Sequence, residues 1–499
     1  MRRTEKADVA IIGSGMGGST VAWALRDAGL DVLVLERGQR LPAEPENSDP
    51  EQMHVKKRYR TAERWLDARA GQMFDPGVYY WVGGNTKIYG AALPRFRESD
   101  FTQVRHAEGI SSPWPFGYDE LEPFYAQAEQ LYRVRGDGTE DPTEPPRSAP
   151  YPFDALAHEP EIERLAGAWR AQGLHPFHSP NGMVLTSQAD RAASTGSDGS
   201  PDEHGHKMDA ENCALDPALA TGRVRLLTGA RIDRLEASNG RVVGAVGEVD
   251  GEPVVVTADR FVLAAGAVNS AAIMLRSADA DHPGGLGNGS DLIGRRYMVH
   301  NSTFFVAVDP RRRNRTQWQK TLGLNDWYES GPSTQHPLGN VQMLGKLREP
   351  MVRAARPWAP RWALRAMTER SVDIYLTTED LADTENRVQL NGNGISVHWK
   401  PNNLGPHAEL VRRMKAVMRK AGYPLIFTER MGIGTNSHQC GTQVAGADRS
   451  TSVLNARCRS HEVENLWVTD SSFFPSSAAL NPALTIAANA LRIAPDIST

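Results

Sequence analysis

The feature that most constrains this 499-residue chain is the stretch 7–38, ADVAIIGSGMGGSTVAWALRDAGLDVLVLERG. Its hydrophobic pattern predicts a strand over 9–12, a helix over about 17–28 and a second strand over 32–35. The turn before the helix carries the pattern G-x-G-x-x-G at Gly13, Gly15 and Gly18. Such glycines permit a tight turn, a close approach of the backbone to a pyrophosphate and close packing of helix on strand. The stretch therefore predicts a dinucleotide-binding α/β fold.

An acidic residue follows this turn at the expected distance. Glu36 ends the second strand, where a carboxylate accepts hydrogen bonds from a ribose hydroxyl and repels a 2′-phosphate. This argues against NADP. We expect Met16 and Arg37 to contact the nucleotide as well. The stretch alone does not decide between FAD and NAD.

Composition excludes several classes of function. The net charge of −4 gives no reason to expect nucleic acid as a partner. The three cysteines, Cys213, Cys440 and Cys458, have no metal or redox spacing and suit a reducing compartment. No signal peptide and no apolar run long enough to span a bilayer is visible. We expect a cytoplasmic protein without a metal.

Three further stretches have the pattern of ligand-binding backbone. VGGNTKIYGAA, at 82–92, suggests backbone pressed against a flat ligand, although a simple glycine turn between strands is an equal alternative. FVLAAGAVNSAAIMLRSA, at 261–278, predicts a strand, a glycine turn and a helix N-terminus that points at the dinucleotide. NLWVTDSSFFP predicts a strand that ends at the acid Asp470, and a helix begins near Asn481-Pro482.

These stretches, together with SHQCGTQVAG at 437–446, resemble the glucose-methanol-choline (GMC) oxidoreductases and stand in that family's order. The resemblance implies an α/β fold with a Rossmann-like FAD-binding domain and an inserted α+β substrate domain built on an antiparallel sheet. It assigns to the FAD-binding domain residues 1–100, 213–300 and 430–499. It assigns to the substrate-binding domain residues 101–212 and 301–429, in which 186–212 is expected to be a mobile loop.

The resemblance also implies roles for single residues. His438 matches the family's catalytic histidine, and Asn481 matches its second polar catalytic residue. Ile88 stands where pyranose 2-oxidases carry a histidine attached covalently to FAD, so FAD is expected to bind non-covalently. The positions expected at the FAD are Gly13, Gly15, Met16, Gly18, Glu36, Arg37, Gly83, Gly84, Asn85, Gly90, Ala91, Ile232, Ala265, Gly266, Asp470, Ser471, Pro482 and Ala483.

The chemistry of alcohol oxidation suits this residue pair. A base must take the hydroxyl proton, and a neutral imidazole has a pKa near working pH. The amide of Asn481 can donate a hydrogen bond to the oxygen as negative charge develops there. A flavin supplies the hydride acceptor. His300, in the stretch GRRYMVH, is a candidate for the lining of the site or for a structural histidine.

Within this family, the stretches at 82–92 and around Asn481 resemble those of bacterial pyranose oxidases and glycoside 3-oxidases. This resemblance implies that a pyranose sugar or glycoside is oxidised at a secondary ring alcohol, carbon 3 favoured over carbon 2, with O2 or another electron acceptor. Alternatives are a sterol or other apolar-alcohol oxidase, a quinone-linked dehydrogenase, and a flavin-binding protein without catalysis. Four aromatic residues could stack on a sugar or belong to the core: Trp318, Trp327, Tyr328 and Trp399.

The segment 351–370, MVRAARPWAPRWALRAMTER, is basic and carries Trp358 and Trp362. Basic aromatic helices lie on membranes or pack on partner subunits. Because Pro357 and Pro360 interrupt the pattern, we expect an oligomer contact or an entrance loop here rather than a membrane contact. A homo-oligomer is therefore an open alternative.

Overall fold

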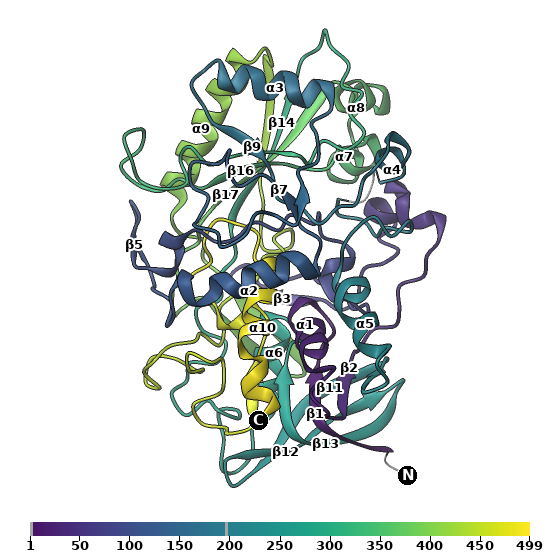
Figure 1. The fold of residues 1–499 in the computed structure, drawn as a ribbon, viewed down its shortest axis with the longest axis vertical. Coiled ribbons are helices and arrows are strands. Elements are labelled where there is room, and N and C mark those ends of the chain that lie inside the picture. Colours follow the sequence, from purple (N-terminus) through teal and green to yellow (C-terminus); the bar gives the residue numbers. More distant parts are fainter. Residues whose placement is uncertain (1–2, 195–197) are drawn as a thin grey trace.

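Two sheets, one above the other along the long axis of the molecule, organise the fold of this computed structural model (Figure 1). The structure describes residues 3–194 and 198–499. The expected mobile loop 186–212 therefore falls in part on residues outside this description. Its described part includes α4 (Gln188–Ala193) and the buried side chains of Ser200 and Lys207.

The lower sheet has seven strands and follows from the N-terminal stretch. β1 (Arg3–Ile12) lies parallel to β2 (Val32–Leu35) on one side and to β13 (Glu252–Leu263) on the other. All four residues of β2 are buried, as expected for a parallel strand covered on both faces. α1 (Met16–Leu25) follows β1 directly. The remaining strands are β10 (Val224–Leu227), β11 (Ala230–Ser238), β12 (Arg241–Val249) and β21 (Leu466–Val468).

The β-rich sequence of 241–256 predicts strand structure throughout, as one continuous strand. This is wrong, because the chain turns back within it. β12 and β13 form an antiparallel hairpin whose turn is Asp250-Gly251. Both residues have positive φ, +50° and +88°. Such a pair forms the two-residue turn that matches the twist of the flanking strands.

The upper sheet is antiparallel, in the order β20-β14-β17-β16-β15-β9. Its buried face packs against the helices α3 (Pro160–Arg170) and α9 (Leu404–Lys420). This confirms the fold class expected from the sequence, an α/β protein with an antiparallel substrate-side sheet. The strands are β9 (Pro176–His178), β14 (Asn301–Val308), β15 (Leu322–Leu324), β16 (Asn340–Met343), β17 (Ser371–Thr378) and β20 (Leu425–Arg430).

Smaller elements complete the fold. A four-stranded sheet joins β3 (Trp65–Asp67), β4 (Gln72–Phe74), β18 (Arg387–Asn391) and β19 (Gly394–His398). Two short pairs are β5 (Val104–Arg105) with β6 (Ile110–Ser111), and β7 (Arg135–Gly136) with β8 (Phe153–Asp154). Apart from the long helix described next, the remaining α-helices of the described residues are α5 (Asp216–Leu219), α6 (Ala267–Arg276), α7 (Glu349–Ala355), α8 (Arg361–Thr368) and α10 (Ala483–Ser498).

The helix α2 (Tyr118–Leu131) crosses the waist of the molecule between the two sheets (Figure 1). The sequence of 112–134 predicts this helix with Asp119 as its N-cap, whereas the N-cap in the structure is Gly117. Tyr125 bonds through its hydroxyl to the Oγ1 of Thr485 in α10, at 2.7 Å. α2 thus packs on a helix of the nucleotide-side unit. The domain boundaries expected from the sequence remain a prediction.

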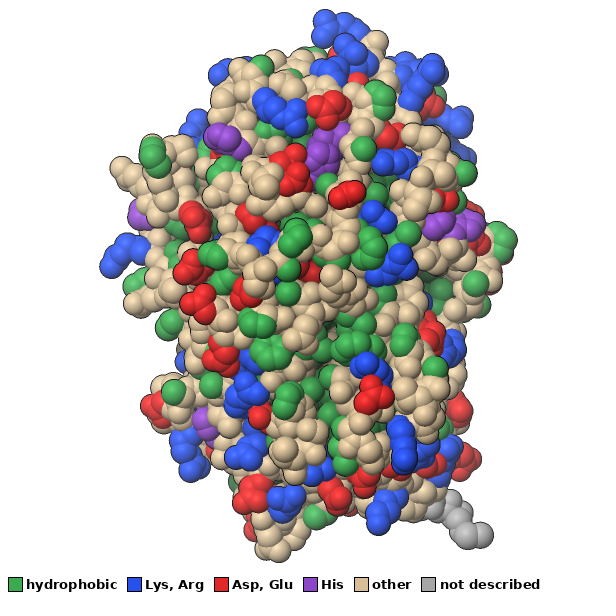
Figure 2. Space-filling view, in the orientation of Figure 1, with side chains coloured by type: hydrophobic (Ala, Val, Ile, Leu, Met, Phe, Trp, Pro, Cys, Tyr) green, Lys and Arg blue, Asp and Glu red, His purple; other side chains and the backbone are tan. Residues whose placement is uncertain are grey.

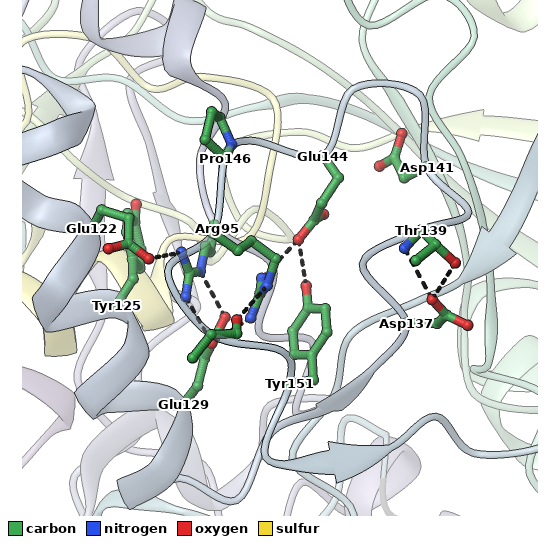
Figure 3. A network of polar contacts seen from close by, with 12 residues as sticks. Arg95, Glu122, Tyr125, Glu129, Asp137, Thr139, Asp141, Glu144, Pro146 and Tyr151 are labelled. Atoms are coloured by element: carbon green, nitrogen blue, oxygen red, sulfur yellow. Dashed lines mark hydrogen bonds and ion pairs between the residues drawn. The ribbon is translucent and has the colours of Figure 1, made fainter.

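A buried ion network ties α2 to the segments around Arg95 and Arg147 (Figure 3). The fully buried Arg95 forms two parallel bonds to Glu129, at 2.8 and 2.9 Å, and a third to Glu122. Arg147 joins Glu129 to Glu144, and Tyr151 also donates to Glu144. Bidentate pairs of this kind fix geometry because both partners are planar.

Candidate functional site

A cavity of about 960 Å³ is lined by elements of both sheets and by the C-terminal segment. Of the twenty positions expected from the sequence, seventeen line it, the pair His438 and Asn481 among them. The other fifteen are Gly13, Gly15, Met16, Glu36, Arg37, Gly84, Asn85, Gly90, Ile232, Ala265, Gly266, Asp470, Ser471, Pro482 and Ala483. Gly18, Gly83 and Ala91 are not in its lining.

The glycines of the first turn divide into packing and open positions. A Cβ on Gly18 would lie 2.0 Å from the carbonyl oxygen of Gly13, so this glycine is needed for packing. A Cβ on Gly15 would meet no atom within 4 Å, and the same holds for Gly266. Both of these glycines line the cavity. Their open space faces the helix N-termini of α1 and α6, where a pyrophosphate would fit.

Glu36 is buried beside the first turn. Its carboxylate accepts hydrogen bonds from the backbone N–H and the hydroxyl of Ser14, at 3.0 and 2.6 Å, and from the N–H of Gly38, at 2.8 Å. Burial raises the pKa of this carboxyl, and the hydrogen bonds from Ser14 and Gly38 oppose that shift. Carboxylate oxygens have further lone pairs, so Glu36 can still accept a bond from a ribose hydroxyl.

Asp470 ties the C-terminal segment to the turn before α6. One of its oxygens accepts from the N–H of Gly266, at 2.9 Å, and from the hydroxyl of Ser270, at 2.5 Å. Burial raises the pKa of Asp470. The other oxygen caps the short helix 471–473 through Ser472. Asp470 thus holds two lining segments of the cavity together.

The structure brings the two predicted catalytic side chains together. Asn481 Nδ2 lies 3.5 Å from His438 Nε2. The amide oxygen of Asn481 accepts a hydrogen bond from Gln342 on β16, at 2.8 Å, so its NH2 group is the one turned to the imidazole. On the other side, His438 Nδ1 lies 3.1 Å from His300 Nδ1.

The hydrogen bonds of His300 determine the tautomer of His438. His300 Nε2 lies 3.1 Å from the carbonyl oxygen of Ser477, which only accepts, so Nε2 carries the proton. Burial lowers the pKa of His300 to about 4, so its ring is neutral and Nδ1 has a free lone pair. His438 Nδ1–H must therefore donate to His300, which leaves the lone pair of His438 on Nε2, beside Asn481.

Electrostatics keep His438 neutral as well. Burial, together with the neighbouring His300 and Lys320, holds the pKa of His438 well below its ordinary value of 6.5. The Lys320 ammonium forms an ion pair with Asp198, at 3.1 Å, and both side chains line the cavity. Asp198 also accepts from the backbone N–H of Gly345, at 2.5 Å.

Several lining or supporting residues were not expected from the sequence. Gln342, Lys320 and Asp198 stand in no recognisable sequence motif, and only the folding of the chain brings them to the site. The four candidate sugar-stacking aromatics are buried and none of them lines this cavity, so the core alternative holds for Trp318, Trp327, Tyr328 and Trp399. Tyr375 and Phe304 line the cavity instead.

Within the described residues, no helix is long and apolar enough to cross a membrane. The same part of the chain holds no group of three or more His, Cys, Asp or Glu side chains that could bind a metal ion.

Comparisons with known proteins show which family this chain resembles. Family models described as GMC oxidoreductase match residues 79–302 and 360–490, and a model described as an NAD(P)-binding Rossmann-like domain matches residues 11–56. Paromamine 6′-oxidase of Streptomyces fradiae is 32% identical over 98% of this chain and 90% of its own length.

Solved structures share the fold along the whole chain. Pyridoxine 4-oxidase of Mesorbium loti superposes with a TM-score of 0.69 at 19% identity, over 98% of both chains. A formate oxidase of Aspergillus oryzae, studied for FAD modification, superposes with a TM-score of 0.68 at 14% identity, over 99% of this chain and 98% of its own.

Proposed function

Because the chain belongs to the GMC oxidoreductase family, we propose that it oxidises a secondary ring alcohol of a pyranose sugar or glycoside to a keto sugar. The family acts on CH–OH groups and implies FAD as the cofactor. FAD supplies the acceptor for the hydride. The observation that carries the proposal is the His438–Asn481 pair on the wall of the same cavity that the first glycine turn and Glu36 line.

The chain's own residues would divide the work as follows. His438 Nε2, held neutral with its lone pair toward the cavity, takes the hydroxyl proton of the alcohol. The NH2 group of Asn481 donates to the same oxygen as negative charge develops. Positioning of the alcohol between these two groups lowers the entropic part of the barrier.

The first turn and the C-terminal segment would hold the FAD. The N–H groups at the start of α1 would bind the pyrophosphate, and Glu36 would accept a hydrogen bond from a ribose hydroxyl. Ala483 can offer a backbone N–H to the ring. We place FAD here without a covalent bond, because Ile88 stands where a histidine attachment would be and no histidine lies between Gly83 and Ala92.

Carbon 3 of a glycoside remains the favoured position and carbon 2 the second. The relative in Streptomyces fradiae is named for paromamine oxidation at a 6′ position, which supports sugar-like substrates. In a pyranose that position is a primary alcohol outside the ring, so its oxidation to an aldehyde is a third outcome. The ion pair of Lys320 and Asp198 in the wall favours a polar substrate over a sterol. A sterol or other apolar alcohol, and a quinone in place of O2, are the alternatives.

The test is anaerobic reduction of the FAD-loaded protein with glucose, methyl glucosides, paromamine and cholesterol. We expect loss of the visible flavin absorbance with a sugar or glycoside, and a keto product whose position NMR assigns. Hydrogen peroxide formed in air separates O2 from other acceptors. Reduction by cholesterol alone would replace the proposal with the apolar alternative, and no reduction by any alcohol would end it.

A further inference from the structure

A surface beside the edge strand β20 of the upper sheet is basic and carries exposed tryptophans. We call it the Arg-Trp face. Figure 2 shows Lys and Arg side chains gathered at the top of the molecule and at its upper right, where α8 lies in Figure 1. The face consists of the loop 309–315, the segment 349–370 with α7 and α8, and the edge strand β20.

Hydrogen bonds and ion pairs make this face continuous. Arg356 pairs with Glu429 of β20, at 2.6 Å. The N–H of Asn314 donates to the carbonyl of Glu369 at the end of α8, at 2.8 Å. Leu425 of β20 lies opposite Val308, which precedes the arginine loop. The three segments therefore form one surface.

Large apolar side chains on this face are exposed to solvent. Trp358 and Trp362 have 80% and 76% of their surface exposed, and Phe427 and Leu425 have 52% and 47%. On α8 the buried positions are Leu364 and Thr368, so Trp362 lies on the opposite arc. These four are among only seven large hydrophobic residues that are exposed in the described part of the chain.

Positive charge dominates the same surface, although the whole chain is slightly negative. Six arginine side chains are at least 45% exposed: Arg311, Arg312, Arg313, Arg356, Arg361 and Arg365. The acids paired with them are fewer, and Asp309 and Glu349 are largely covered, with 8% and 13% of their side chains exposed.

The sequence favours an oligomer contact or an entrance loop here, because Pro357 and Pro360 interrupt the pattern, but both prolines lie between α7 and α8 and break neither helix. We propose instead that the Arg-Trp face docks on an anionic lipid surface. Tryptophan prefers the boundary between headgroups and acyl chains, and arginines beside it bind anionic headgroups. A second copy of the chain is a poorer occupant, because a twofold contact would set each arginine cluster against its own copy. Arg353 of α7 also bonds to Glu51, in the turn that carries the cavity residue His54, so docking would occur beside the cavity wall.

The test is co-sedimentation of the FAD-loaded protein with vesicles of phosphatidylcholine alone or with about one third phosphatidylglycerol. We expect at least ~10-fold stronger binding to the anionic vesicles, weakened by salt. The double variants Arg361→Glu/Arg365→Glu and Trp358→Ala/Trp362→Ala should lose it. The matched control Arg234→Glu/Arg241→Glu, on exposed arginines of the lower sheet, should not.

The proposal would be overturned if the wild type did not bind anionic vesicles at low salt, or if the control variant lost as much vesicle binding as the arginine and tryptophan variants. Light scattering that shows a dimer for the wild type and a monomer for the tryptophan variant would assign the face to a second copy. If RNA binds the protein more tightly than the anionic vesicles do and releases it from them, the Arg-Trp face would be assigned to nucleic acid.

A separate observation concerns the orientation of Asn481. Behind Gln342, a line of buried amides runs across the upper sheet to a carboxylate. Gln342 Nε2 also donates to Asn340, at 3.1 Å, Asn340 Nδ2 donates to Asn325, at 2.8 Å, and Asn325 Nδ2 donates to Asp141, at 2.7 Å. All of these side chains are buried.

The ends of this line fix its direction. Asp141 is paired with Arg97, at 2.5 Å, and an ionised carboxylate only accepts. Asn325 must therefore donate to Asp141, which leaves its amide oxygen to accept from Asn340. In the same way, the amide oxygen of Asn340 accepts from Gln342. We infer that Asp141 is a positioning residue: through the three amides it turns the NH2 group of Asn481 to the cavity. This inference rests on the proposed function, in which that NH2 group binds the alcohol oxygen.

The test compares two isosteric variants, one that keeps the hydrogen bond from position 342 to Asn481 and one that removes it. Asn340→Asp can no longer donate to Asn325, but it places an accepting carboxylate directly beside Gln342, in the role that Asp141 has at the end of the line. Gln342 then still donates to Asn481, so we expect flavin reduction within ~3-fold of wild type. Gln342→Glu cannot donate to Asn481 when ionised, so we expect a ~10–100-fold loss. As the pH falls, the new carboxyl at position 342 becomes protonated and regains a donor, so partial recovery of the Gln342→Glu rate at low pH would be the signature of the lost hydrogen bond.

The outcomes separate this inference from the proposed function. Wild-type FAD that no alcohol reduces would remove the proposed function. Wild-type reduction with equal rates in Asn340→Asp and Gln342→Glu, or a Gln342→Glu rate that does not rise at low pH, would remove only the role of the amide line.

Discussion

At the scale of single residues, the site depends on one imidazole with its lone pair toward the cavity. Replacing His438 with Ala removes the proposed base, and we expect flavin reduction to slow by ~10²–10⁴-fold. FAD should stay bound, since the first turn and Asp470 are untouched. Stopped-flow reduction and the visible spectrum measure both. A rate equal to wild type would exclude His438 as the base.

The neighbouring His300 should act on pH dependence. The base works when it is deprotonated. Because the pKa of His438 is lowered, the rate of flavin reduction should not change as the pH falls through 6.5, and it should decrease only at lower pH. His300→Asn retains an acceptor for His438 but removes one cause of the lowered pKa. We expect a small change in the maximal rate and a loss that begins at higher pH. His300→Leu, without an acceptor, should lose ~10-fold or more at all pH values.

Residue identity at the site was predictable only where chemistry lies in local motifs. His438, Asn481 and the glycines stand in such motifs, and the structure places the histidine and the asparagine side by side. Gln342 and Lys320 come from strands and loops far along the chain, so only the pairing of β16 with β17 and the fold of the upper sheet bring them near. Nothing in their neighbouring residues indicates that contact.

At the scale of elements, the turn before α1 gives a matched pair of glycine variants. Gly15→Ala should leave the fold intact, because its Cβ meets no atom and φ is −69°, but it should lower FAD affinity by intruding on the cavity. Gly18→Ala should lower the melting temperature, because its Cβ would lie 2.0 Å from a carbonyl oxygen. FAD content and thermal unfolding measure the two effects. Equal behaviour of both variants would contradict the division.

The network on α2 is the second test at this scale. Glu129→Ala leaves the fully buried Arg95 without its bidentate partner, and we expect the free energy of unfolding to fall by about 3 kcal/mol. The exposed pair of Arg170 and Glu163 is the control, and Arg170→Ala should cost less than about 1 kcal/mol. Urea denaturation measures both. A cost for Glu129→Ala no larger than that of the control would show that the network does not stabilise α2.

Elements with strong periodicity were predictable, and their ends less so. The strand-turn-helix at β1 and α1, and the helix α10 after Pro482, follow the sequence pattern. The hairpin at Asp250-Gly251 was missed because apolar strand residues continue on both sides of its turn. The start of α2 was predicted two residues too late, at Asp119. The actual N-cap is Gly117, and a glycine has no side chain that would mark a cap in the sequence.

At the scale of the whole molecule, both sheets contribute walls to one cavity, so the cofactor should stabilise the complete chain. We expect FAD removal to lower the melting temperature. Added FAD at ~100 times its dissociation constant should raise the free energy of unfolding of the FAD-free protein by about 2.7 kcal/mol. Denaturation should release all flavin into the supernatant, as non-covalent binding requires. Flavin that stays on the denatured chain would contradict the absence of a covalent link.

The hydrogen bond from Gln342 to Asn481 has a consequence for how such a molecule could diversify. The asparagine belongs to the tail of the chain and the glutamine to the opposite sheet, so neither half alone sets the reacting geometry. A chimaera that exchanged the upper sheet between relatives to alter substrate choice would also exchange the partner of that asparagine. Modular exchange of specificity is therefore constrained, and successful chimaeras should carry a donor at the position of Gln342.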